Sequence, residues 1–361
     1  MNNQKCVFTP LGIDHLTIAC DDNTLWSQTL GRLGFDRVKA KPDKSHPFDA
    51  EDYDAYFGIA MALNHTRIFL ADPHTKRFAK DSIKQFLRDH GNMQVVEVGI
   101  RIDSIRKARE ECRDNKKILL IPQLYYGDTF GDCVAVRFNF SPLSSFVSTF
   151  VERRETFCAG IDHIAIAVEH LDRWMKHYQS YWGFEIIYSP HGQEEGLIKG
   201  EKSAMKTFAL RRGGWTVALV EGVDRERTSQ VTTYRKTHGN HSVQHAALIF
   251  NDLENTATSW LTKGVRFRLS GILSSPSERL TIDHILHRGE DYGGPLLQCF
   301  TKPFARIKGK GGFFFELIER ISSEKKQEDK QAFHDPTVIG LFESIEREEM
   351  AGDTGLILSP V

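Results

Sequence analysis

An internal repeat is the feature that most constrains how this chain can fold. Gly12-Ile13-Asp14-His15 recurs as Gly160-Ile161-Asp162-His163, about 148 residues later. Each copy continues as an apolar strand, a helix-like stretch with a tryptophan eleven residues after the histidine, and then a Gly-Phe pair. The tryptophans are Trp26 and Trp174, and the Gly-Phe pairs are Gly34-Phe35 and Gly183-Phe184. A repeat of this length indicates one structural unit present twice, so we expect two halves of the same architecture.

A weaker repeat inside each half predicts a smaller structural unit. The strand-like segment 95–102 precedes the helical segment 105–115, as 243–250 precedes 253–264. Each half then contains two strand-helix-strands modules, which predicts an α+β fold of tandem βαβββ modules in two open-barrel domains. The segment 141–159, rich in serine and charge, is the natural boundary, so we predict domains at 1–150 and 151–361. A last helix begins near Pro336, because proline is favoured at the first helical position.

Composition describes an ordinary globular chain. Its 361 residues are 40% hydrophobic, enough for real cores, and carry a net charge of -1, which excludes a long-range field for nucleic acid or an acidic membrane. The six cysteines are scattered without a C-x-x-C pair, and the start lacks a secretory apolar run, so we predict a reduced, cytoplasmic protein. No segment approaches the roughly 18 apolar residues of a membrane span. We expect a small-molecule substrate and a homo-oligomer.

The segment 313–320 places a carboxylate among apolar neighbours. On a strand, Phe314, Glu316 and Ile318 share one face. An unpaired carboxylate there costs roughly several kcal/mol, so a cation should meet it. Arg320, two positions beyond Ile318 on the same face, is the plain candidate for that cation.

Two histidines lie in similar apolar surroundings. His163 and His245 each share a predicted strand face with aliphatic residues, and each has an alanine two positions further on, at Ala165 and Ala247. A small alanine leaves space beside the imidazole. A lone histidine on such a face is usually a satisfied core residue, and His15 in the first half has the same surroundings. The repeat by itself therefore indicates common ancestry rather than chemistry.

The second half differs because it supplies a complete ligand set. His163, His245 and Glu316 lie on three predicted strands, whereas the first half has Val98 where His245 would fall and no carboxylate in its candidate last strand, 133–140. Two histidines and one carboxylate hold Fe(II) on one face and leave the opposite positions open for a chelating substrate and oxygen. We therefore predict an Fe(II) site in the second half. The first half is interpreted as a structural copy that lost this site or never had it.

Several further motifs resemble those of one known family. They are Gly160-Ile161-Asp162-His163, Ser229-Gln230-Val231 followed by Val243-Gln244-His245, and the segments 296–303, 313–320 and 341–346. On these motifs the chain resembles the 4-hydroxyphenylpyruvate dioxygenase family of the vicinal oxygen chelate superfamily over nearly its whole length. The resemblance implies a glyoxalase-like fold and an Fe(II)-dependent oxidoreductase. Its expected reaction turns 4-hydroxyphenylpyruvate, or a close aryl 2-oxo acid, and O2 into homogentisate and CO2 in tyrosine catabolism.

The resemblance also assigns roles to residues of this chain. It implies that the metal ligands are His163, His245 and Glu316, that Gln230 and Gln298 are catalytic and substrate-binding, and that Phe300 and Phe333 bind the substrate, Phe300 by stacking on its ring. The C-terminal helix is expected to close the pocket. Each pocket residue also has a plainer interpretation. On that interpretation Gln230 caps a turn, Gln298 is an exposed strand residue, and Phe300 belongs to the core.

Three departures from the family concern the pocket rather than the iron site. Val338 stands where a second ring-stacking phenylalanine is expected, and Val220 stands where the family has a pocket amide. Ser203-Ala204-Met205 lies near the family's pocket serine, in a register that the sequence leaves open. We therefore expect 4-hydroxyphenylpyruvate to bind less tightly than in a typical member.

Alternative functions stay open beside the favoured one. A closely related family hydroxylates the benzylic carbon and makes 4-hydroxymandelate, and another 2-oxo acid is a further possibility. An extradiol ring-cleaving dioxygenase uses the same ligand types but needs an additional pocket histidine and tyrosine, which the segment 298–303 does not suggest. A non-catalytic relative would keep only the fold, and the retention of all three ligands argues against it.

Overall fold

The chain divides into two compact units in the computed structural model. The structure describes residues 8–39, 50–79, 81–114, 124–128, 131–138, 140–153, 158–190, 196–270, 280–291, 294–307, 311–321, 333, 335–353 and 355–358. The first unit comprises residues 1–161 with 212–215, and the second comprises 162–211 with 216–361. The domains expected at 1–150 and 151–361 stay a prediction about independent folding units. None of the described helices is long and apolar enough to cross a membrane.

The first unit contains two βαβββ modules. Its first module consists of β1 (Pro10–Ala19), α1 (Asn23–Arg32), β2 (Asp36–Arg37), β3 (Ile59–Leu63) and β4 (Thr66–Ala71), with α2 (Ala50–Phe57) inserted before β3. After α3 (Ser82–His90), its second consists of β5 (Gln94–Ile102), α4 (Ile105–Asp114), β6 (Leu124–Asp128), β7 (Gly131–Phe138) and β8 (Val147–Arg153). The modules meet where β1 and β5 pair antiparallel, so one open sheet runs in the order β2-β3-β4-β1-β5-β8-β7-β6.

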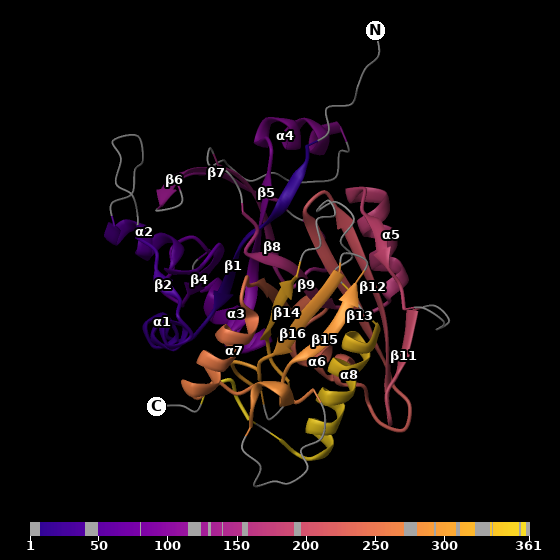
Figure 1. The fold of residues 1–361 in the computed structure, drawn as a ribbon. Coiled ribbons are helices and arrows are strands. Elements are labelled where there is room, and N and C mark those ends of the chain that lie inside the picture. The colour runs from indigo at the N-terminus through magenta and orange to yellow at the C-terminus, as the bar shows by residue number, and fades with distance from the viewer. Residues whose placement is uncertain are drawn as a thin grey trace. The chain divides into compact units, whose positions relative to one another are not determined.

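The second unit repeats this plan (Figure 1). Its first module consists of β9 (Ile161–Ala167), α5 (Leu171–Trp182), β10 (Glu185–Tyr188), β11 (Leu197–Lys199), β12 (Ala204–Arg212) and β13 (Trp215–Val223). After α6 (Gln230–His238), its second consists of β14 (Ser242–Ile249), α7 (Leu253–Thr262), the 3-10 helix η2 (Ile282–His284), β15 (His287–Asp291), β16 (Gly294–Phe300) and β17 (Phe314–Arg320). Strand β9 pairs with β13 and β14, and β14 continues through β17 and β16 to β15.

Equivalent residues begin the equivalent helices in the two units. The Glu152 carboxylate at the end of β8 accepts a hydrogen bond from the backbone N–H of Ile105 at the start of α4. In the second unit Glu319 on β17 does the same for Leu253 at the start of α7. A carboxylate at a helix N-terminus satisfies an otherwise unpaired N–H and complements the helix dipole. These contacts show that β8 and β17 occupy the same place in their modules.

The position of β8 corrects two expectations from the sequence. The segment 141–159, expected as a boundary between domains, contains a full strand of the first sheet, Val147–Arg153. The segment 133–140, expected as the last strand of the first half, contains β7, which is the strand before last. The serine-rich composition of 141–146 was misleading because a polar turn leads directly into a strand whose residues are mostly buried.

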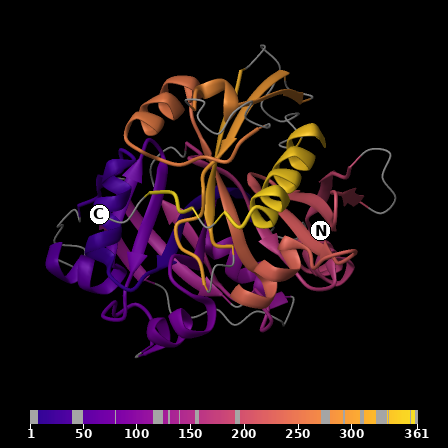
Figure 2. The same ribbon diagram turned by 90° about the horizontal axis from the view of Figure 1, so that it is seen from below.

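The C-terminal helix α8 (Asp335–Met350) lies beside the sheet of the second unit, where Figures 1 and 2 draw it in yellow. Its start confirms the helix expected near Pro336. The stripe of Val338, Leu341, Phe342 and Ile345 recurs at helical spacing and faces the interior of this unit. Helix α8 therefore makes one wall of that interior.

Candidate metal centre

Three strands of the second unit bring two histidines and one carboxylate together. His163 on β9, His245 on β14 and Glu316 on β17 are all buried, and their ligand atoms lie within 4.8 Å of one another. Nε2 of His163 is 3.3 Å from Glu316 Oε2, and Nε2 of His245 is 3.5 Å from the same oxygen. Neighbouring ligands about 2.1 Å from one metal ion are themselves about 3 Å apart. The trio therefore fits around a single ion.

Contacts with residues outside the trio fix the orientation of His163. Its Nδ1 lies 2.8 Å from Asp162 Oδ2, and Arg320 donates to both carboxylate oxygens of Asp162 at 3.2 Å. Asp162 accepts the proton on Nδ1, which leaves the lone pair of Nε2 for the metal. Arg320 therefore pairs with Asp162 and not with Glu316, the partner that the plain interpretation of the sequence gave it. Asp162 stands in the repeated Gly-Ile-Asp-His motif, so the sequence held a signal for this contact.

The charges of the trio depend on each other. Burial alone would lower the pKa of His163, but the charge of Glu316 and the hydrogen bonds of Asp162 and Glu316 outweigh burial and raise this pKa to about 9. Burial would raise the pKa of Glu316, but the charge and hydrogen bond of His163 lower it to about 2. Burial lowers the pKa of His245. Without a metal, a proton on His163 balances the buried carboxylate, and a divalent ion would replace it.

Gln298 on β16 completes the environment of Glu316. Its Nε2 donates to Glu316 Oε1 at 2.5 Å, so both oxygens of the carboxylate are engaged. The side chain is buried, which excludes the plain interpretation as an exposed strand residue. Its own Oε1 has no hydrogen-bond partner among the described residues. A buried acceptor beside the trio is therefore available to a bound molecule.

An apolar pocket opens from the trio. Its lining comes from strands, from the start of α6 and from α8, and includes the three candidate ligands and Gln230, Gln298, Phe300 and Phe333. The ring of Phe333 lies 4.6 Å from that of His163, centroid to centroid, and Phe300 pairs in register with Glu316. Thus all the residues that the resemblance assigned to a pocket lie at this one. Gln230 does begin a helix, α6, but its side chain reaches across to α8.

The three departures from the family have different outcomes. Val338 and Val220 line the pocket, as the resemblance predicted. Ser203 does not; its hydroxyl contacts Glu346 on α8, 2.5 Å away, and Met205 lines the pocket in its neighbourhood. Ser203 precedes the first residue of β12, Ala204, so the alternation of faces along the strand does not place its side chain beside that of Met205. Of this segment, Met205 therefore faces the pocket and Ser203 faces α8.

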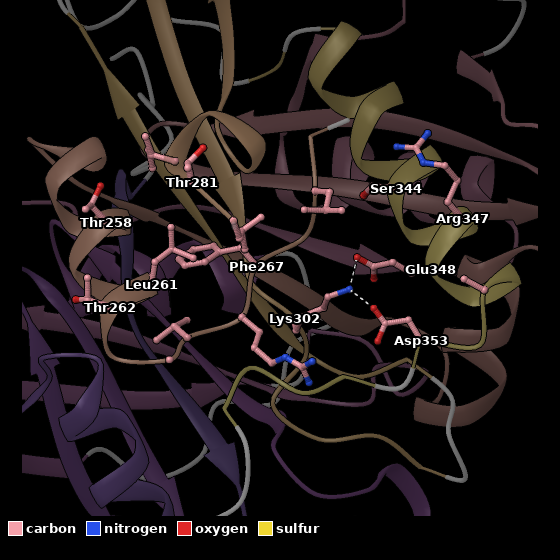
Figure 3. Close-up of a pocket in the computed structure, with 17 residues that line it drawn as sticks. Thr258, Leu261, Thr262, Phe267, Thr281, Lys302, Ser344, Arg347, Glu348 and Asp353 are labelled. Carbon is pink, nitrogen blue, oxygen red and sulfur yellow. Dashed lines mark hydrogen bonds and ion pairs between the residues drawn. The ribbon is translucent and has the colours of Figure 1, made fainter. Parts of the chain in front are cut away.

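The opposite side of α8 borders a second cavity, of about 1060 Å³ (Figure 3). There Lys302 Nζ lies 2.5 Å from Glu348 Oε1 and 2.8 Å from Asp353 Oδ2. Arg268 also pairs with Glu348, and its guanidinium lies 4.7 Å from the centre of the Phe314 ring. Among the described residues, no group of three or more potential metal ligands lies here. This side of α8 is held by ion pairs.

The first unit holds its own cation in the equivalent place. The paired register aligns Glu97 with Val147, as it aligns His245 with Phe314. The residue equivalent to His245 is therefore Glu97, and the expectation of Val98 was wrong by one position. Two residues along β8, Thr149 replaces Glu316 and donates to Glu97. Arg77 and Arg137 donate to Glu97 at 2.7 and 3.1 Å, so guanidinium groups compensate the carboxylate here.

The fold and the trio define a class of protein. Residues 160–270 match the family model described as the Glyoxalase/Bleomycin resistance protein/Dioxygenase superfamily. This agrees with the βαβββ modules and confirms the predicted fold class. The matched residues include two of the three candidate ligands.

Individual relatives narrow the similarity. A 4-hydroxyphenylpyruvate dioxygenase of Legionella pneumophila (strain Corby) is 26% identical over 211 residues, 54% of this chain and 56% of that protein. One of Hordeum vulgare is 24% identical over 285 residues, 70% of this chain and 64% of that protein. A triple mutant of 4-hydroxymandelate synthase from Streptomyces coelicolor has the same fold, with a TM-score of 0.70, 19% identity, and coverage of 94% of this chain and 99% of that one. The matches in sequence thus span a little more than half of each dioxygenase, and they confirm the predicted resemblance.

Proposed function

We propose that the protein is an Fe(II)-dependent dioxygenase that acts on 4-hydroxyphenylpyruvate or a close aryl 2-oxo acid. In this proposal O2 and 4-hydroxyphenylpyruvate give homogentisate and CO2, as in tyrosine catabolism. The observation that carries it is the buried trio of His163, His245 and Glu316 at the end of an apolar pocket. Two histidines and one carboxylate leave open positions on iron, which a substrate and oxygen can share.

The chemistry divides between the ion and the chain. Fe(II), held by the three side chains, would supply chelation of the 2-oxo acid and activation of oxygen. Gln298 fixes the Glu316 carboxylate through its amide and keeps its own carbonyl oxygen available. Phe300 and Phe333 give the substrate ring apolar faces next to the ligands. The helix α8 covers the pocket and excludes water from it.

The similarity in sequence to named dioxygenases supports an aryl 2-oxo acid as the substrate. The altered pocket is expected to weaken the binding of that substrate. Val220 and Val338 supply apolar surface where an amide and an aromatic ring were expected. We expect weaker binding of the substrate ring, because an aromatic pair contributes about 0.5–1.5 kcal/mol beyond burial. The position that oxygen attacks, on the ring or on the benzylic carbon, depends on how this pocket aims the substrate.

Oxygen uptake on a panel of 2-oxo acids tests the proposal. Protein loaded anaerobically with Fe(II) should consume O2 with 4-hydroxyphenylpyruvate and release one CO2 per O2. Chromatography of the product then separates homogentisate from 4-hydroxymandelate. Iron-dependent uptake with a catechol instead of a 2-oxo acid would assign ring cleavage. No uptake with either class, in protein that holds stoichiometric iron, would overturn the proposal.

A further inference from the structure

A buried carboxylate joins α8 to the sheet beside the metal pocket. Glu346 is 2% exposed. It accepts hydrogen bonds from the backbone N–H of Glu201 at 2.7 Å, from that of Lys202 at 3.3 Å, and from the Ser203 hydroxyl at 2.5 Å. All three donors lie in the turn between β11 and β12. We call these four residues the latch.

The turn is shaped to receive the helix. A Cβ atom at Gly200 would lie 2.7 Å from Glu346 Oε2 and 2.7 Å from Phe342 Cε1. Atoms in well-packed interiors do not approach so closely. Phe342 and Glu346 are four residues apart and so share one face of α8. Glycine at position 200 thus allows this face to approach the turn.

The docked helix sets the orientation of a pocket amide. Gln230 Nε2 donates to the backbone carbonyl oxygen of Phe342 at 2.9 Å. Because a carbonyl oxygen only accepts, the nitrogen end of the amide must face it. The Gln230 Oε1 has no hydrogen-bond partner among the described residues, and the side chain lines the metal pocket. The position of α8 therefore decides which end of this amide a ligand can meet.

The closed pocket leaves little space for a substrate. Its free volume is about 50 Å³, enough for a few water molecules. Val338, Leu341, Phe342 and Ile345 form its wall on the side of α8. Most of the other lining residues lie on hydrogen-bonded strands, whose displacement would break ladders of backbone bonds, and Gln230 and Val231 lie at the start of α6. An aryl 2-oxo acid therefore enters while α8 is displaced outward.

We propose that Glu346 is a positioning residue that holds α8 closed over the metal pocket and, through the Phe342 carbonyl, orients Gln230 toward the substrate. A carboxylate suits this role because charge-assisted hydrogen bonds are strong when buried. When α8 moves away from the turn, water solvates the Glu346 carboxylate, so the open state does not leave a buried unpaired charge. In this account Ser203 acts on the helix and not on the substrate. The part that concerns substrate rests on the proposed function.

Hydrogen exchange of α8 tests the latch without turnover. In Glu346→Ala, loaded with Fe(II) under anaerobic conditions, the amides of 335–350 should exchange about tenfold faster or more, because each hydrogen bond to a charged group is a strong one. The matched control is Glu343→Ala. Glu343 is three residues earlier on α8, its side chain is 43% exposed, and its partner Arg347 is 3.7 Å away. The control should exchange like the unmodified protein, and both variants should bind the same amount of iron.

A second variant covers the case in which Glu346→Ala does not fold. Ser203→Ala removes one donor and leaves the carboxylate, so α8 exchange should rise several-fold. In steady-state assays either variant should raise KM for 4-hydroxyphenylpyruvate more than it lowers kcat. Exchange of α8 that matches the Glu343→Ala control in both variants would overturn the latch. Faster exchange in a protein that consumes no 2-oxo acid would leave the latch standing and remove only the proposed function.

Discussion

The contact between His163 Nδ1 and Asp162 decides which imidazole nitrogen is free for the metal. Arg320 in turn holds Asp162, so the orientation passes from the end of β17 to the start of β9. The same pattern exists in the first unit, where His15 Nδ1 lies 2.9 Å from Asp14 and Arg153 donates to Asp14 at 3.3 Å. A histidine held by an aspartate is therefore part of the repeated framework, and chemistry requires the other two ligands as well.

Asp162→Asn should weaken metal binding without removing it. The amide keeps an acceptor for His163 but loses the charge that pairs with Arg320, and loss of such an outer contact costs about 10–100-fold in metal affinity. Competition with a chelator measures this affinity. The matched control, Asp14→Asn, should leave it unchanged. Equal affinities in Asp162→Asn and the unmodified protein would show that Asp162 does not orient the ligand.

Val338→Phe should tighten the aryl substrate. The new ring restores the wall expected from the family, and an added aromatic contact of about 0.5–1.5 kcal/mol corresponds to about a two- to tenfold lower KM for 4-hydroxyphenylpyruvate. The opposing effect is overpacking of the small pocket, which costs about 1–3 kcal/mol. Lost turnover in this variant, together with efficient use of a smaller 2-oxo acid by the unmodified protein, would contradict the aryl assignment.

Equivalent strands in the two units place their carboxylates differently. In the second unit the carboxylate lies on β17 at Glu316, and a metal ion is the proposed cation. In the first unit it lies on β5 at Glu97, where Arg77 and Arg137 supply the positive charge. Burial would raise the pKa of Glu97, but the charges of Arg137 and Arg77 outweigh burial and hold it well below its usual range. The equivalent place in the repeat therefore serves stability in one unit and is proposed to serve catalysis in the other.

Glu97→Gln should destabilise the first unit in a pH-dependent way. Because the folded pKa is depressed, the stabilisation by Glu97 is complete well above the unfolded pKa of about 4.3 and is lost as the pH falls below it. At pH 7 the loss should be about 3–5 kcal/mol, since the buried Arg77 and the partly buried Arg137 lose their counter-charge. Urea unfolding at pH 7 and pH 3 measures the difference, with Glu343→Gln as an exposed control. A difference that does not shrink at pH 3 would contradict this role.

For the whole molecule, the repeat in the sequence predicted most of the architecture. The spacing of the repeated motifs placed the modules. The alternation or periodicity of apolar residues placed the last helix and the strands that carry His163, His245 and Glu316, because secondary structure depends on local sequence patterns. Asp162 and Glu346 were missed, since their partners lie 158 and 143 or more residues away. The misplaced Val98 has another cause, because the match of 95–102 with 243–250 already sets Glu97 opposite His245, and the pairing of β5 with β8 agrees with it. Long-range register requires the folded chain.

Iron stoichiometry tests the central claim most directly. Anaerobic titration with Fe(II), followed by metal analysis, should give one iron per chain in the unmodified protein and in His15→Ala. Glu316→Ala should give none, although it relieves a buried charge and stays folded because the strand is packed by other residues. Retention of one iron by Glu316→Ala, with turnover intact, would contradict the assignment of His163, His245 and Glu316 as the metal centre.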